Sequence, residues 1–351
     1  MPGKILISLF GVVTLFGCAT ERPDIQAICS RDQIGNYIIK WETDPLIDGS
    51  LKVFVSKDPD DFDKTKPALF ANAQDGITTY ITNDNVTRNY FLLSFNDKYT
   101  KIVGSRGLSM DRIQNLRDMG GYPAPHHKTT RWGKVYRSGT IANRTEWDSV
   151  RLSKLGIKTI IDLRDEEEFA LKPTQFGDVK VFHFPVSVED LNEIPTRIRE
   201  GRMRKGDAIL FMQDQYIKYT TENKKAFTDA LEVFQNKENY PILFNCSLGK
   251  DRAGFLAAML LAALDVSEEE ITKDYTTSND YIDVSYLSYL AEGLSWEAQE
   301  AITVLISAQE AFIAPTLQKI KRDYGSIDKY LSKELGVSEK ERENLKEILL
   351  Y

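Results

Sequence analysis

An apolar strand and an apolar helix flank one short polar loop, and this feature constrains the fold more than any other. Residues 241–244 read Pro-Ile-Leu-Phe and residues 253–264 are almost wholly apolar, so both segments are expected to be buried. The loop between them runs from Asn245 to Arg252 and reads Asn-Cys-Ser-Leu-Gly-Lys-Asp-Arg. A strand, a tight loop and a helix in this order are typical of an α/β domain with a central sheet flanked by helices.

The sequence on both sides of this unit continues the alternation of strands and helices. The further elements expected are, in chain order, a helix beginning at Thr145 and ending near Gly156, strands over 157–163 and 179–186, a helix over about 213–234, a helix beginning at Ser267, and closing helices interrupted at Gly325 and Gly336. We therefore predict that residues 107–351 form one α/β domain.

Short runs rich in Val, Ile, Tyr and Phe precede this domain, and turn-forming stretches such as Asp58-Pro59-Asp60-Asp61 separate them. Evenly spaced short strands are typical of a small all-β sandwich, and the pattern over 34–106 resembles an immunoglobulin or fibronectin type III module. The strands are expected over residues 37–41, 51–55, 78–81, 90–95 and 101–103. Since no catalytic set of residues lies among them, a spacer or docking role is expected.

The first residues have the order of a secretory signal, with Lys4, then an apolar run from Ile5 to Phe16, then Gly17 and Cys18. The run is too short for a permanent membrane span. Its end resembles the lipobox of bacterial lipoproteins, in which such a cysteine is acylated and becomes the new N-terminus. The resemblance implies a signal peptide over 1–17, lipidation at Cys18, a linker over 18–33, and a membrane-anchored lipoprotein of the cell envelope that faces the periplasm or the cell exterior. A simple secretory signal cut elsewhere and an uncleaved anchor are the alternatives.

Composition limits the partners and cofactors. The formal net charge of −7 and the pI near 5.3 argue against a nucleic-acid partner, so an anionic ligand must meet a local basic site. Three histidines and three cysteines without a Cys-x-x-Cys pair form no recognisable zinc set, and neither a metal nor another cofactor is expected. Cys29 is interpreted as a small core residue. The presence of a second lone thiol, Cys246, is then best explained by a chemical role.

Cys246 and Arg252 frame a loop of the length that a phosphate group requires. Five residues between them allow backbone N–H groups to surround phosphate oxygens, and the helix that follows adds its positive dipole end. The Arg252 guanidinium is suited to grip two oxygens, and the same field favours a Cys246 thiolate that attacks phosphorus and forms a cysteinyl-phosphate. The residues predicted to bind phosphate are Ser247, Leu248, Gly249, Lys250, Asp251 and Arg252.

The loop resembles the signature His-Cys-x-x-Gly-Lys-Asp-Arg-[Ser/Thr]-Gly of a bacterial branch of the tyrosine phosphatase superfamily. Similar segments recur in the order found in that branch, over residues 115–121, 136–139, 161–164 and 324–331, so that the resemblance spans about 108–351. It implies a phosphomonoester hydrolase whose substrates are phosphotyrosine proteins or, in some members, phosphorylated inositols and their lipids. A weakly active phosphate-binding or docking lipoprotein is the third hypothesis.

Within this resemblance, Asp251 is predicted to be the general acid, and Asp190 is the alternative because it follows a strand on a separate loop. Lys250 is expected to face the substrate. Two positions depart from the signature, since Asn245 replaces the histidine and Ala253 replaces the hydroxyl residue, and both changes are expected to weaken activity.

Buried ion pairs are expected to brace the loop from neighbouring segments rather than to take part in the reaction. The residues expected to support the loop are Asn245, Arg117, Asp118, Asp162 and Arg164.

Overall fold

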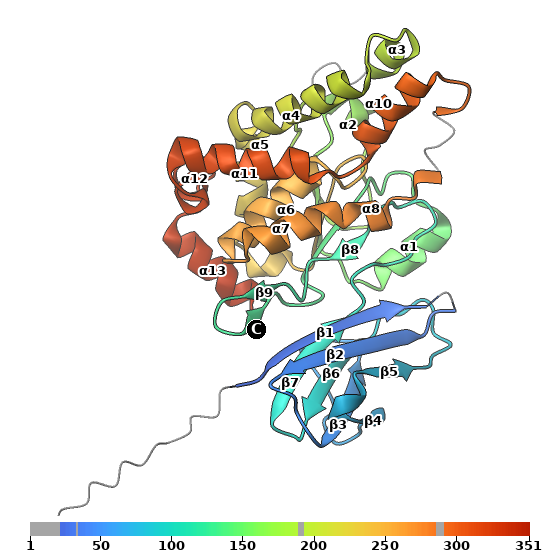
Figure 1. Cartoon of the computed structure of the whole chain (residues 1–351), viewed down its shortest axis with the longest axis vertical. Coiled ribbons are helices and arrows are strands. Elements are labelled where there is room, and N and C mark those ends of the chain that lie inside the picture. Colours follow the sequence, from blue (N-terminus) through green and yellow to red (C-terminus); the bar gives the residue numbers. More distant parts are fainter. Residues whose placement is uncertain (1–21, 33, 189–192, 286–290) are drawn as a thin grey trace, which may run out of the picture.

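The computed structural model describes residues 22–32, 34–188, 193–285 and 291–351. The predicted signal peptide, Cys18 and Asp190 lie outside these ranges. Figure 1 shows a smaller region of strands next to a larger region in which helices surround a sheet. None of the helices in the described ranges has the length and apolarity needed to cross a membrane.

The smaller region consists of two antiparallel sheets with the strand orders β1-β2-β5 and β4-β3-β6-β7. The strands are β1 (Asp24–Arg31), β2 (Tyr37–Asp44), β3 (Ser50–Ser56), β4 (Leu69–Asn72), β5 (Ile77–Tyr80), β6 (Tyr90–Phe95) and β7 (Tyr99–Gly104). A shared core of large side chains lies between the sheets, including Tyr37, Trp41, Phe91 and Phe95. The prediction of an all-β sandwich ahead of an α/β domain is confirmed.

Strand β1 corrects the linker that was expected over 18–33. Its eight residues pair with β2 along their whole length, from Asp24 opposite Asp44 to Arg31 opposite Tyr37. Polar residues interrupt this segment and its face toward the core is only partly buried, so it lacks the dense apolar run of a core strand. Cys29 lies on that face against the β-sandwich core, and burial raises the pKa of its thiol to about 12.

The larger region contains a five-stranded sheet with the order β13-β12-β14-β11-β8. The strands are β8 (Arg117–Asp118), β11 (Val135–Ser138), β12 (Thr159–Asp162), β13 (Lys180–His183) and β14 (Ile242–Asn245), and a short hairpin is formed by β9 (Pro123–Ala124) and β10 (Lys128–Thr129). Only β8 is antiparallel to its neighbour. Ser138, Asp162 and Asn245 are aligned at the carboxyl ends of three parallel strands, which is the edge where α/β proteins place their sites.

The helices of the α/β domain are α1 (Glu146–Ser153), α2 (Glu166–Leu171), α3 (Ile194–Arg199), α4 (Lys205–Thr221), α5 (Lys224–Val233), α6 (Arg252–Ala263), α7 (Glu268–Thr276), α8 (Ser278–Tyr281), α10 (Trp296–Ile306), α11 (Glu310–Tyr324), α12 (Ile327–Glu334) and α13 (Glu339–Leu349). The single helix expected over about 213–234 is in fact two helices, because the chain turns at Glu222 and Asn223.

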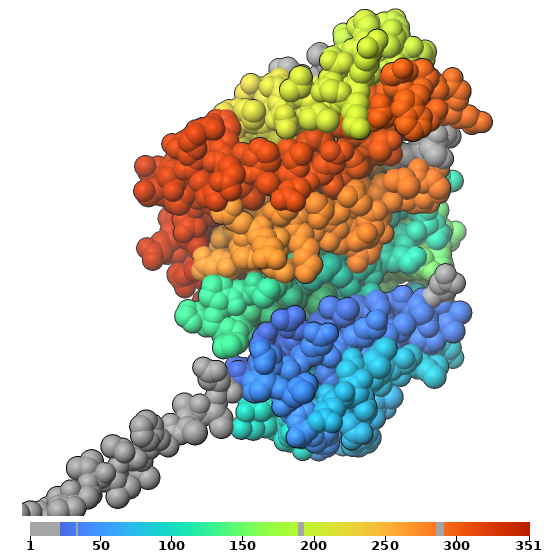
Figure 2. All heavy atoms as spheres, viewed as in Figure 1, coloured from blue at the N-terminus to red at the C-terminus, as the bar shows by residue number. Residues whose placement is uncertain are grey.

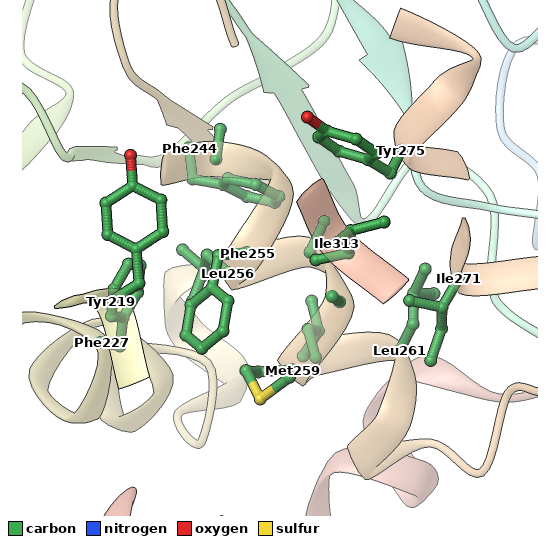
Figure 3. Packing of buried hydrophobic residues seen from close by; sticks show 14 of the residues in the cluster. Tyr219, Phe227, Phe244, Phe255, Leu256, Met259, Leu261, Ile271, Tyr275 and Ile313 are labelled. Carbon is green, nitrogen blue, oxygen red and sulfur yellow. The ribbon is translucent and has the colours of Figure 1, made fainter. Parts of the chain in front are cut away.

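Helix α6 is the centre of the domain, and all twelve of its residues are buried. Figure 3 shows side chains of α6 packed among those of β14, α4, α5, α7 and α11. The side chains labelled there are Tyr219, Phe227, Phe244, Phe255, Leu256, Met259, Leu261, Ile271, Tyr275 and Ile313. This packing fixes the N-terminus of α6, and with it the loop that precedes the helix.

The β-sandwich packs directly against the α/β domain (Figure 2). Buried contacts join the two, since the Tyr90 and Tyr136 hydroxyls lie 3.3 Å apart and the Trp132 indole donates to the Ile102 carbonyl over 3.2 Å. Arg106, between the domains, stacks its guanidinium 3.9 Å from the centre of the Tyr122 ring. These contacts join the two domains, while each domain keeps its own hydrophobic core.

Candidate active site

The predicted phosphate loop, residues 246–252, connects the carboxyl end of β14 to the first residue of α6. Cys246 is only 2% exposed and lies at the base of the loop. Gly249 has a φ of +68°, and a Cβ at this position would lie 2.3 Å from the Ser138 carbonyl carbon. Only glycine fits this close approach between the loop and the end of β11.

Arg252 is buried and bonded by side chains at the open side of the loop. Its two terminal nitrogens pair with the Glu168 carboxylate, over 2.5 and 3.3 Å, and one of them donates to the Ser247 hydroxyl over 2.6 Å. Glu168 also accepts a hydrogen bond from Ser247. A planar guanidinium held on two sides loses little freedom on meeting an anion, so Arg252 is preorganised.

The charges of this contact support each other. Burial alone would raise the pKa of Glu168, but hydrogen bonding and the charge of Arg252 hold that pKa at about 2. Burial would lower the pKa of Arg252, yet the neighbouring Cys246 and Glu168 raise it overall. A guanidinium that stays charged beside Cys246 is the condition under which a thiolate is stabilised.

Asp162 and Arg164 support the loop through α2 rather than by touching it. The Arg164 guanidinium pairs with the Asp162 carboxylate over 2.8 to 3.1 Å and also donates to the Glu168 and Lys172 carbonyls. Thr174 donates to the same carboxylate. This cluster holds the C-terminal half of α2, the helix that presents Glu168 to Arg252.

Arg117 supports the inner side of the loop through Asn115. Its guanidinium donates to the Asn115 side-chain oxygen, and the Asn115 amide nitrogen donates to the Leu248 and Gly249 carbonyls over 3.2 and 2.9 Å. Asn115 has a φ of +57°, a conformation that asparagine tolerates better than most residues.

Arg137 and Asp274 complete this inner network. Arg137 donates to the Gly249 and Lys250 carbonyls over 2.8 and 3.2 Å and pairs with Asp274, which also pairs with Arg117. Burial would raise the pKa of Asp274, but the two arginines hold it at about 2. Two buried cations and one anion therefore fix the loop carbonyls on the inner side of the loop. The loop N–H groups are then expected to point to the opposite side, where phosphate would bind.

Asp118 makes no contact with the loop itself, which corrects the expected direct support of the loop by this residue. Its carboxylate pairs with Arg88 of the β-sandwich and accepts backbone hydrogen bonds from Gly120 and Gly133. Adjacent residues of a strand point to opposite faces, so Arg117 faces the loop while Asp118 faces the other domain.

Lys250 does not face the substrate side, and this expectation is also corrected. Its ammonium is fully buried and donates to the Leu305 and Ser307 carbonyls over 2.5 and 3.0 Å. These carbonyls lie at the C-terminal end of α10, where helix carbonyls lack partners in the helix and favour a cation. Lys250 therefore links the loop to the helices above it, and burial lowers its pKa.

Asp251 is the N-cap residue of α6, and its side chain is 22% exposed. One carboxylate oxygen accepts a hydrogen bond from the Tyr216 hydroxyl over 2.9 Å, and the Tyr275 hydroxyl lies 3.5 Å away. The pKa of Tyr216 is raised well above its usual value by burial and by Asp251, so this hydroxyl keeps its proton. Both tyrosines thus orient Asp251.

Asn245 and Ala253, the two departures from the signature, are both fully buried. Neither polar atom of the Asn245 side chain has a hydrogen-bond partner in the described part of the chain, so the expected support of the loop by Asn245 is wrong. Ala253 lies in the first turn of α6 and contributes no hydroxyl.

The supporting residues that were not predicted as parts of the site include Glu168, Asn115, Arg137 and Asp274. Glu168 was detectable in principle, because Asp165 and Glu168 form a capping box that places a helix directly after Arg164. Asn115 and Arg137 lie in segments singled out only for their resemblance, and Asp274 has no local signal because its role depends on two distant strands. Packing brings these residues together.

A cavity of about 640 Å³ opens beside the loop. Its lining includes Thr140, Lys172, Ser247, Leu248 and Glu168. The arrangement combines a buried thiol, a preorganised guanidinium, an orientable carboxylate and space for the remainder of a substrate. These are the parts that phosphoryl transfer to a cysteine requires.

Comparison with known proteins identifies relatives of the α/β domain. A protein of Cupriavidus necator named as a tyrosine-protein phosphatase is 31% identical over 244 residues, which covers 67% of this chain and 86% of that protein. The triple specificity protein phosphatase PtpB of Mycobacterium tuberculosis is 25% identical over 270 residues, covering 67% of this chain and 96% of PtpB. A tyrosine-protein phosphatase of Nostoc commune is 24% identical over 231 residues, covering 60% and 72% of the two chains.

Solved structures give a weaker likeness. The catalytic core of the S. cerevisiae phosphatase Siw14 is 16% identical, with a TM-score of 0.29 and coverage of 57% of this chain and 99% of that one. TpbA of P. aeruginosa is 14% identical, with a TM-score of 0.24 and coverage of 49% and 86%.

The model of the tyrosine phosphatase family matches residues 108–351, the whole of the α/β domain. That match and the relatives above agree on one assignment. The chain belongs to the tyrosine phosphatase family and is a phosphatase.

Proposed function

We propose that the protein hydrolyses phosphomonoesters through a cysteinyl-phosphate on Cys246. The observation that carries this proposal is the Arg252 guanidinium, held by Glu168 and Ser247 at the end of a loop that begins with a buried cysteine. A fixed bidentate cation beside a thiol has no evident structural purpose, whereas it suits the equatorial oxygens of a phosphoryl group in transfer.

In the first step the Cys246 thiolate attacks phosphorus and the bond to the ester oxygen breaks. Asp251 gives its proton to the leaving oxygen, with Tyr216 and Tyr275 orienting the carboxyl group. In the second step Asp251 accepts a proton from water, the water oxygen attacks phosphorus, and Cys246 leaves as the thiolate. The loop N–H groups and Arg252 stabilise the charge on the phosphoryl oxygens in both steps.

Phosphotyrosine in proteins is the proposed substrate class, in keeping with the family. A second class, phosphorylated inositols and their lipids, is favoured by one observation. The cavity beside the loop is lined by polar and basic side chains, including Lys172 and Arg112, which suit substrates that carry further anionic groups.

Cys246→Ser tests the mechanism. It should abolish release of phosphate from phosphotyrosine peptides while leaving the melting temperature nearly unchanged, because a serine hydroxyl does not ionise usefully here. Vanadate should inhibit the unmodified protein, since it mimics the five-coordinate transition state. Full activity in the serine variant would rule out the cysteine mechanism.

We further propose that the protein is an exported lipoprotein anchored through Cys18. The order of Lys4, the apolar run and the Gly-Cys pair supports this proposal. Labelled palmitate should enter the full-length protein in a bacterial host and should not enter Cys18→Ser. Equal labelling of both proteins would contradict it.

A further inference from the structure

We propose that the β-sandwich is a working part of the phosphatase and that its Arg88 is a positioning residue for the phosphate loop. The proposal rests on the function proposed above for that loop. It concerns residues that the family match does not cover, because Arg88 lies in the segment between β5 and β6, ahead of residue 108.

Arg88 enters the α/β domain as a nearly buried cation, with its side chain 7% exposed. Its guanidinium pairs with the fully buried Asp118 carboxylate and donates to the Ser105 carbonyl over 2.6 Å. It also lies 4.5 Å from the centre of the Tyr90 ring and 5.8 Å from that of Tyr136. The position is therefore defined on several sides.

Surface contacts between the two domains look different. The Asp60 carboxylate pairs with Lys134 over 2.8 Å, but all the side chains involved are about a third exposed. Exposed pairs of this kind contribute little and are expected in any docked domain. A buried pair is costly to break, because removal of one partner leaves the other charge without compensation.

Strand β8 connects the Arg88–Asp118 pair to the phosphate loop. The strand is only two residues long, Arg117 and Asp118, and it pairs with Arg137 and Tyr136 of β11. With Asp118 bound to Arg88, β8 is fixed from the side of the β-sandwich. Arg117 on the opposite face is then held where it meets Asn115 and Asp274.

From there two paths of hydrogen bonds reach the loop carbonyls. Asn115 donates to Leu248 and Gly249, and Arg137, which shares Asp274 with Arg117, donates to Gly249 and Lys250. A small shift of β8 would therefore move the carbonyls and, with them, the N–H groups that face phosphate. Misplacement of about 1 Å by a change far from the reacting atoms is enough to cost about 100-fold in rate.

The test compares Arg88→Met, Arg88→Lys and the control Arg31→Met in the full chain. Arg31 belongs to the same domain and lies over the Tyr37 ring, and its guanidinium donates to Gly35, Asp84 and Asn85 of that domain. The control thus removes the same charge without touching β8. Measurements are made at a temperature at which circular dichroism shows every variant folded.

Two quantities are measured. One is kcat/KM for a phosphotyrosine peptide. The other is the concentration of inorganic phosphate that half-protects Cys246 from iodoacetamide, followed by mass spectrometry of the Cys246 peptide. Arg88→Met should lower kcat/KM by about 10- to 100-fold and raise the half-protecting concentration at least about tenfold. Arg88→Lys should recover part of both, and Arg31→Met should match the unmodified protein.

A purely structural role would lower the melting temperature and leave both quantities unchanged in the folded variant, and this result would overturn the proposal. If Arg88→Met does not fold, Arg88→Lys decides in the same way. Absence of turnover in the unmodified protein would refute the proposed function alone, because protection of Cys246 by phosphate still reports on the loop. Protection that does not respond to Arg88 would refute the positioning role.

Discussion

The inner and outer sides of the phosphate loop are both held by ion pairs, but the two sets of pairs differ in exposure and in partners. On the inner side Arg117, Arg137 and Asp274 are at most 2% exposed, and Arg137 donates to the loop carbonyls. On the outer side the Glu168 and Asp251 side chains are each 22% exposed, and Glu168 also lines the cavity beside the loop. The inner side is therefore expected to determine stability and loop geometry, and the outer side to determine reactivity.

Asp251→Asn should show the largest effect on activity, and it should separate reactivity from stability most clearly. Aryl phosphates with poor leaving groups should slow by about 10²- to 10⁴-fold, because only they need a proton in the transition state. Those with good leaving groups should be affected far less, and the melting temperature should hardly change. A series of aryl phosphates with known leaving-group pKa provides the measurement.

Equal slowing across that series would assign Asp251 to the structural side of the comparison. The general acid would then have to lie elsewhere, and Asp190, outside the described residues, would be the next residue to replace. Tyr216→Phe is the matched milder change, since it removes one hydrogen bond to Asp251 and keeps the ring.

Asp274→Asn should have the next largest effect, and on stability rather than reactivity alone. It leaves Arg117 and Arg137 buried without their common anion, at a cost of about 3–5 kcal/mol in the free energy of unfolding. Urea denaturation measures this loss. The control is Asp229→Asn, because Asp229 pairs with the 85% exposed Lys225 and should contribute below about 0.5 kcal/mol.

The same residue predicts a pH dependence. The folded-state pKa of Asp274 is about 2 against an ordinary value of 3.8, so its contribution is fully present above about pH 4 and is lost as pH falls toward 2. The unmodified protein should therefore lose stability over this range more steeply than Asp274→Asn. If the free energy of unfolding falls equally with pH in both proteins, the Asp274 carboxylate does not account for the loss of stability.

Glu168→Gln tests the outer side at Arg252. Loss of a charge-assisted contact of about 1.5–3 kcal/mol should lower kcat/KM by about 10- to 150-fold. Glu166→Gln is the control, since Glu166 is 78% exposed and lies in the same helix. A large fall in stability without loss of kcat/KM would place Glu168 with the inner residues.

Glu168 should not produce the acid limb of the activity profile. Its folded-state pKa of about 2 lies below the ordinary 4.5, so the contact with Arg252 is complete above about pH 5 and is lost only as pH falls toward 2. If Glu168→Gln shifts the acid side of the pH–activity profile between pH 5 and 7, the low pKa assigned to Glu168 is contradicted.

The difference between the two sides also explains what could be read from the sequence. Cys246, Gly249 and Arg252 follow one another in a strand, loop and helix, so their arrangement is encoded locally and was predicted. Asp274 and Asn115 reach the loop from segments far away in the chain, and no local pattern announces such contacts. The direction of a side chain is equally nonlocal, since the Lys250 ammonium donates to carbonyls at the end of α10, a helix far from the loop in the sequence.

The β-sandwich illustrates the same limit at the level of elements. Five of its strands were expected from apolar runs, whereas β1 and the short strand β4 were missed. The strand form of β1 depends on pairing with β2 rather than on its own pattern. Asp118 was expected to brace the loop together with Arg117, but the alternation of side chains in β8 turns its carboxylate toward Arg88 of the β-sandwich.

Ala253→Ser should have the smallest effect on activity. It tests whether a hydroxyl at the start of α6, between the inner and outer sides of the loop, assists the second chemical step. Ala253 is fully buried at the start of α6, and the Ser247 hydroxyl is already bonded to Arg252 and Glu168. A serine hydroxyl at 253 should donate to the leaving Cys246 thiolate in the second step, and one hydrogen bond of about 0.5–1.5 kcal/mol should raise kcat by about 2- to 10-fold. If breakdown of the cysteinyl-phosphate limits turnover, the unmodified protein should show a pre-steady-state burst of alcohol release that shrinks in the variant. Relative to alanine, serine adds one non-hydrogen atom where threonine would add two, so strain in the packed helix is kept low. Stopped-flow traces without a burst, together with an unchanged kcat in Ala253→Ser, would show that the second step does not depend on a donor at this position.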